Sequence, residues 1–151
     1  MRRDLVEYAR SVANADIQGT LDWLLAQGCV PLAGRGGQNE SFGDLSVILG
    51  LPSGAKINID RDRGQWFCSV AAGSQQDLVP LNALITAMSG HPPVVETSEF
   101  LPQQLPERVL WRQAVPDVIT WLESEDRRSA VAAALDSWRR AMKDRLGDER
   151  S

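Results

Sequence analysis

Several residue types that carry chemistry are scarce in this chain of 151 residues. It has one histidine, His91, and two cysteines. Cys29 and Cys68 are isolated and belong to no Cys-x-x-Cys or Cys/His pattern. This arrangement is typical of reduced thiols in a protein core and not of a metal site or a structural disulfide. The sequence therefore predicts no metal ion and no other cofactor.

A positive charge excess and long apolar runs are also missing. The chain has 16 Lys+Arg against 20 Asp+Glu, a formal net charge of -4, whereas nucleic-acid binders gather positive charge. Its longest apolar runs, such as Leu45–Leu51, are far shorter than the ~18–20 residues that span a bilayer. Met1-Arg2-Arg3 leads into a charged amphipathic segment and not into the apolar stretch of a signal peptide. We expect a cytoplasmic protein that binds neither nucleic acid nor membrane.

The length and the 43% hydrophobic content suit one domain, residues 1–151. Apolar residues in 3–27 follow two helical stripes of different phase, which predicts two helices broken near Asn14–Asp16. Asp16 is predicted to cap the second helix, and Gly28 to end it in a left-handed conformation.

Residues 29–72 are predicted to form an antiparallel β-meander. Cys29–Leu32 reads as an edge strand, because its proline cannot donate to a ladder, and the glycine-rich stretch Ala33–Ser41 reads as a loop. Apolar residues then alternate along three strong strands. Pairing Ile59 with Trp66, Ile57 with Cys68 and Ala55 with Val70, together with Leu49 and Val47 opposite Ile57 and Ile59, buries one face of all three strands.

Residues 77–146 read as helices. Asp77 is predicted to cap a helix that ends before Gly90, a second helix contains Pro116, and a last helix starts around Ser124–Asp126. The predicted fold class is α+β: an antiparallel three- to four-stranded β-meander packed by N-terminal helices and a C-terminal helical half.

The same register gives the meander a second face of mixed polar and apolar residues. Ile48, Asn58 and Phe67 are predicted to share one row across it, a composition suited to recognising another protein. The alternative is that helices cover this face as well. For an open face and the adjoining hairpin tip, the candidate protein-binding residues are Ile48, Lys56, Asn58, Asp60, Arg61, Asp62, Arg63 and Phe67.

Catalysis has little support in the sequence. His91 precedes two prolines in a connector, and Asp60 and Asp62 alternate with two arginines that would oppose a bound cation. We expect no catalytic, cofactor-binding or metal-binding residues. A small enzyme using His91 or the Asp60/Asp62 pair is the less favoured alternative.

Two stretches carry a family resemblance. Ser41-Phe42-Gly43-Asp44-Leu45 and, after an apolar strand, Ile59-Asp60-Arg61-Asp62-Arg63-Gly64-Gln65-Trp66-Phe67 resemble a pattern in small bacterial proteins that look like immunity proteins of polymorphic-toxin or contact-dependent inhibition systems. The similarity extends from the second predicted helix through the third strong strand. It implies a non-enzymatic protein that neutralises a cognate toxin, usually encoded beside it. The toxin-contacting surface varies among such proteins, so no binding residue is carried over.

A second function class fits the same size and charge. An acidic secretion-chaperone-like homodimer that holds an export substrate would have an α+β order too. That class usually shows further strands in its second half, whereas residues 75–146 read as helical here. The sequence therefore favours the toxin-binding function over this alternative.

Overall fold

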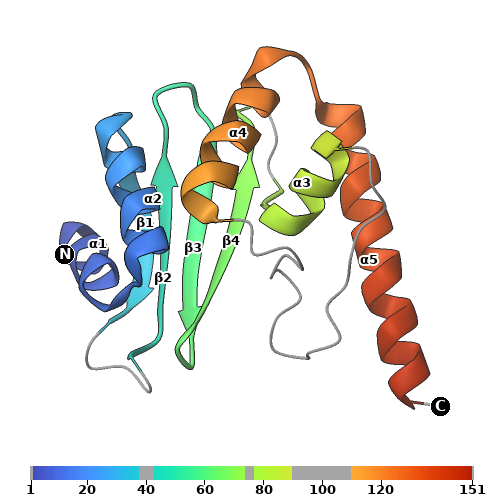
Figure 1. Ribbon diagram of the computed structural model, residues 1–151, viewed down its shortest axis with the longest axis horizontal. Coiled ribbons are helices and arrows are strands. Elements are labelled where there is room, and N and C mark those ends of the chain that lie inside the picture. The colour runs from blue at the N-terminus through green and yellow to red at the C-terminus, as the bar shows by residue number, and fades with distance from the viewer. Residues whose placement is uncertain (1, 38–42, 74–76, 90–109, 151) are drawn as a thin grey trace.

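The computed structural model of the chain describes residues 2–37, 43–73, 77–89 and 110–150 (Figure 1). Five helices and a five-stranded antiparallel sheet confirm the α+β class within these residues. The elements are α1 (Arg2–Val12), α2 (Ala15–Ala26), β1 (Val30–Gly36), β2 (Leu45–Gly50), β3 (Lys56–Asp62), β4 (Gln65–Ala71), β5 (Val79–Pro80), α3 (Leu81–Ser89), α4 (Trp111–Ser124) and α5 (Arg128–Arg150).

The sheet is a meander in the order β1-β2-β3-β4-β5. One of its faces, here called the inner face, packs against helices. Val47, Leu49, Ile57 and Ile59 are 0% exposed there and join one core cluster with apolar residues of all five helices. In Figure 1, α2 and α4 cross in front of the sheet. Because side chains alternate along a strand, the residues between these buried ones point to the opposite, outer face.

The pairing between β3 and β4 differs from the predicted one by two residues. Ile59 lies opposite Cys68, and Ile57 opposite Val70, whereas the predicted pairs were Ile59 with Trp66 and Ile57 with Cys68. The reason is a two-residue turn, in which Arg63 and Gly64 have φ of 53° and 81°. Two left-handed residues match the twist of a tight hairpin better than the predicted longer connection. A shift of two keeps each side chain on its predicted face, and the pairing of β2 with β3 is as predicted.

β1 is an edge strand, as predicted, but it extends through Ala33–Gly36, which was predicted to be loop. Glycine serves close packing here: a Cβ on Gly34 would lie 2.6 Å from Cδ1 of Leu5 in α1. The φ of Gly36 is +86°. Gly37 follows the strand, and residues 38–41 of the predicted loop lie outside the described residues.

The break between α1 and α2 is where the sequence predicts it, but the predicted cap is wrong. Asn14, not Asp16, is the N-cap of α2, and its Oδ1 accepts a hydrogen bond from the Ile17 N–H at 3.0 Å. Gly28 follows α2 with φ of +85°, as predicted.

Asp16 instead caps a helix far away in the sequence. Its two carboxylate oxygens accept hydrogen bonds from the backbone N–H groups of Trp111 and Arg112, each at 2.9 Å. These are first-turn donors of α4, whose own N-cap residue, Leu110, has no side-chain acceptor. One carboxylate therefore joins α4 to the first turn of α2.

Two boundaries in the second half also differ from the prediction. α3 begins at Leu81, because Val79 and Pro80 pair with Val70 and Ser69 as a short fifth strand, so Asp77 does not cap this helix. α5 begins at Arg128, two to four residues later than predicted, after Glu125 in an extended conformation. His91 lies outside the described residues. None of the helices in the described ranges combines the length and apolar character that crossing a membrane requires.

Replacing Asp16 with alanine should lower the free energy of unfolding by about 2 kcal/mol, because two backbone donors of α4 lose a charged acceptor. Urea denaturation measures the loss. Asp117→Ala on the exposed side of α4 is the control, since no described residue bonds to its carboxylate. Equal stability of the two variants would show that the Asp16 cap does not stabilise the fold.

The two thiols predict a pH dependence of stability. Both thiols are buried and neither is in a disulfide. Burial raises the pKa of Cys29 to about 11, and burial with the nearby Asp60 charge also raises the pKa of Cys68. An unfolded thiol ionises near pH ~8.5. Between pH 9 and 11 the unfolded chain therefore holds fewer protons than the folded chain, so the free energy of unfolding should fall as pH rises. Cys29→Ala should show a shallower fall in urea denaturation; an identical pH slope would contradict this account.

Candidate functional site

The outer face of the sheet keeps its side chains partly accessible. Lys56 is exposed, and Ile48, Asn58, Asp60 and Phe67 are half-buried, in contrast to the sealed residues between them. The apolar residues of the described helices pack on the inner face. Helices within the described residues therefore cover one face, not both.

The rows across the outer face are not the predicted ones. Ile48 and Asn58 align with Ser69, so the predicted row with Phe67 is wrong. The tight Arg63-Gly64 turn moves Phe67 opposite Asp60 instead. The resulting row crosses four strands and consists of Arg35, Ser46, Asp60 and Phe67.

This row lies in a cleft of about 560 Å³, within the range of ligand sites. We call it the outer-face cleft. Three carboxylates, two guanidinium-bearing residues and one aromatic ring belong to its lining. The lining residues are Arg35, Gly36, Asp44, Leu45, Ser46, Asp60, Arg61, Asp62 and Phe67.

A chain of hydrogen bonds orients one of the carboxylates. The Ser46 hydroxyl donates to Oδ1 of Asn58 at 3.2 Å, and Nδ2 of Asn58 donates to Oδ2 of Asp60 at 2.9 Å. Asp44 is held differently: its Oδ1 accepts from the backbone N–H of Arg63 at 2.8 Å. The cleft is thus built on paired strands with fixed polar groups.

Arg61 fastens the rim of the cleft to the helical layer. Its Nη1 donates to the Gly43 carbonyl at 3.0 Å and contacts the Tyr8 hydroxyl at 3.5 Å. The Tyr8 hydroxyl also donates to that carbonyl, at 3.4 Å. These bonds join β3 to α1 and to the segment that enters β2, so Arg61 has a structural role beside its predicted one in binding.

Half of the predicted binding residues line the outer-face cleft: Asp60, Arg61, Asp62 and Phe67. Ile48 and Asn58 lie one row away, Lys56 is at the far end of β3, and Arg63 is at the hairpin tip.

Sequence reasoning missed Arg35 and Asp44 as site residues. Asp44 stood within the family-like pattern. Arg35 was assigned to a loop, and only the extension of β1 brings it beside Ser46. The alternation of apolar and polar side chains that marks a strand cannot be seen in Ala33–Gly36, because two of these four residues are glycines.

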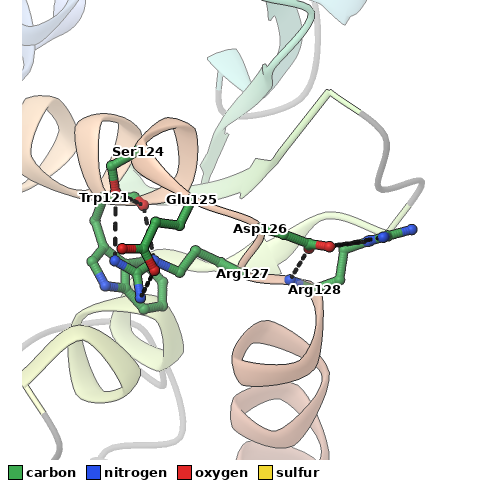
Figure 2. Close-up of polar contacts among 6 residues, drawn as sticks. All are labelled: Trp121, Ser124, Glu125, Asp126, Arg127 and Arg128. Atoms are coloured by element: carbon green, nitrogen blue, oxygen red, sulfur yellow. Dashed lines mark hydrogen bonds and ion pairs between the residues drawn. The ribbon is translucent and has the colours of Figure 1, made fainter.

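The connection between α4 and α5 borders a second, smaller cleft of about 270 Å³. Figure 2 shows that its charges are paired internally: the Arg127 guanidinium lies over the Trp121 ring, 5.0 Å from its centroid, and 3.5 Å from a Glu125 oxygen. Asp126 and Arg128 form an ion pair at 2.7 Å, whose hydrogen bonds lower the pKa of the Asp126 carboxyl to about 2. These contacts hold the corner between the two helices.

No group of three or more His, Cys, Asp or Glu side chains in the described residues is arranged to hold a metal ion. Comparisons of the chain with protein-family models, with curated proteins and with solved structures gave no match.

Proposed function

We propose that this chain is a non-enzymatic protein-binding module, an immunity protein that neutralises a bacterial toxin by covering its active site. The observation that carries the proposal is the accessible outer face beside a rigid hairpin. Its apolar side chains, Ile48 and Phe67, stand among charged neighbours. Interfaces commonly have this arrangement, with apolar or aromatic anchors inside a polar rim.

β1 adds apolar surface to the same face. Leu32 is 40% exposed, and its side chain lies over Gly50, since a Cβ there would be 2.8 Å from Cδ1 of Leu32. Val30, at the start of the strand, is 55% exposed. An edge strand and a sheet face with exposed apolar groups together offer room for an interface of ordinary size, roughly 800 Å² per partner.

The rigidity of the face also favours binding by occlusion. The bonds from Arg61 to Gly43 and Tyr8, and from Arg63 to Asp44, fix the hairpin against neighbouring elements. A surface that is already ordered loses less conformational entropy when it docks. The mechanism needs no chemistry from this chain.

The test is co-expression with the product of the adjacent gene, because the family resemblance implies that a toxin is encoded there. We expect that product to stop bacterial growth, this chain to restore it, and the two to form a stable complex in size-exclusion chromatography with light scattering. Continued growth arrest without a complex would overturn the proposal. A homodimer that holds an unfolded export substrate would instead indicate the chaperone-like function.

Phe67→Ala should weaken toxin binding by about 2 kcal/mol, roughly thirtyfold in Kd, because an aromatic anchor is lost from the interface. Its effect on the unfolding midpoint should be small, since the ring is half-buried on the outer face. Calorimetric titration and thermal denaturation measure the two effects. Leu25→Ala, which truncates an exposed side chain of α2, is the control. A large loss of stability with unchanged affinity would place Phe67 in the core instead.

Arg63→Glu should slow association with the toxin, because Arg63 is exposed at the hairpin tip, where its charge can steer the approach of a partner. The slowing should shrink as salt rises, since screening weakens exposed charges. Stopped-flow mixing at low and high salt checks this, with Arg139→Glu on the exposed side of α5 as the control. The same on-rate for wild type and Arg63→Glu at low salt would remove the tip from the interface.

A further inference from the structure

Two carboxylates of the outer-face cleft, Asp60 and Asp62, differ from three other aspartates of this fold in their charged neighbours. Asp22, Asp126 and Asp136 each form an ion pair with an arginine. Among the described residues, no lysine or arginine side chain lies within ion-pair distance of Asp60 or Asp62. The folded chain thus leaves negative charge in a concave site.

The strand geometry brings these two carboxylates close together. Asp60 and Asp62 are two residues apart on β3 and point to the same face, which separates them by about 6.6 Å along the strand. A cation placed between them relieves their mutual repulsion. No lysine or arginine of the described residues forms an ion pair with either carboxylate, so none competes with that cation. The hydrogen bond from Asn58 holds one carboxylate in place for such a cation.

Phe67 adds an aromatic surface to the same location. It is the direct cross-strand neighbour of Asp60, so their Cβ atoms lie about 5 Å apart on the outer face. A flat cation that binds here interacts favourably with both groups: with the quadrupole of the aromatic ring and with the negative charge of the carboxylate. A guanidinium fits this pair better than an ammonium, because it is planar, stacks on rings and bridges carboxylates through several donors.

Arg35 limits the site to one cation. It lies in the same row as Asp60 with Ser46 between them, so it is two strand spacings away, about 9.5 Å. Its positive charge disfavours a second cation at that end of the cleft. Arg61, the other guanidinium-bearing residue of the lining, is bound at the rim to the Gly43 carbonyl. The negative part of the outer-face cleft is therefore at Asp60 and Asp62, beside Phe67.

We infer that the outer-face cleft receives the guanidinium of an arginine side chain on the partner protein, between Asp60, Asp62 and the ring of Phe67. This inference rests on the proposed function and names the chemistry that the partner presents. A lysine in the same place forms one point contact and binds more weakly.

The test uses the full chain and three blocked tripeptides, acetyl-Gly-X-Gly-amide, in which X is arginine, lysine or citrulline. Citrulline keeps the shape of arginine and lacks its charge. In a titration followed by amide chemical shifts, the arginine peptide should bind with a Kd on the order of millimolar and shift the amides of Asp60 and Phe67. The lysine peptide should bind more weakly, and the citrulline peptide should leave these amides unchanged.

Asp60→Asn keeps a side chain that can accept from Asn58 and removes the charge. It should weaken binding of the arginine peptide about tenfold. Asp117→Asn, which removes an exposed charge on α4, should leave binding unchanged. Equal shifts with the citrulline peptide, no saturable binding of the arginine peptide, or unchanged affinity of Asp60→Asn would each overturn the inference.

The two proposals fail in distinguishable ways. If Phe67→Ala weakens toxin binding but the arginine peptide does not bind, the outer face is the interface and the arginine inference is wrong. If the arginine peptide binds at Asp60 but the toxin does not bind the chain, the preference of the cleft stands and the immunity function is wrong.

Discussion

The alternation of side chains along β2, β3 and β4 is the constraint on which the rest of the structure depends. Each of these strands buries alternate side chains beneath the helices, as the exposure of 0–1% shows for Val47, Leu49, Ile57, Ile59, Cys68 and Val70. The period of two then places the intervening residues on the other face of the sheet, away from the helices. The helices can seal one side of such a sheet and leave the second side for another molecule. A one-sided core and an accessible outer face are two consequences of one periodicity.

A turn of two residues decides what stands beside what on that accessible face. Arg63 and Gly64 both adopt positive φ, and this places Phe67 beside Asp60 and not beside Asn58. A connection two residues longer would preserve the core, because a shift of two residues returns each side chain to its own face. It would nevertheless separate the aromatic ring from the carboxylate. The stability of the fold and the composition of its cleft are therefore set by different features of the hairpin.

The same distinction explains how far the sequence could predict the structure. Periodicity gives β2, β3 and β4, the buried face, the broken helix pair and the pairing of β2 with β3, because all of these follow from local patterns of apolar residues. It does not give the pairing of β3 with β4, since an arginine in a left-handed conformation leaves no apolar signal. It also misses the contact of Asp16 with α4, made by residues 95 and 96 positions apart. Arg35 was missed because it stands between Gly34 and Gly36, which carry no apolar pattern, and Gly34 is there to let Leu5 approach.

The contrast between the two charged regions of the molecule supports a recognition role for the sheet and not for the helical corner. Between α4 and α5, the cations Arg127 and Arg128 are matched by Glu125, Asp126 and the Trp121 ring, so each charge stabilises the local conformation. On the sheet, the bonds to Asp60 and Asp44 come from an amide and a backbone N–H, which orient a carboxylate without cancelling its charge. An oriented but uncancelled charge in a concave, aromatic-lined site contributes little to folding. In the proposed complex, its favourable interaction is realised when the guanidinium of the partner enters, so the proposal assigns the partner to the cleft and not to the corner.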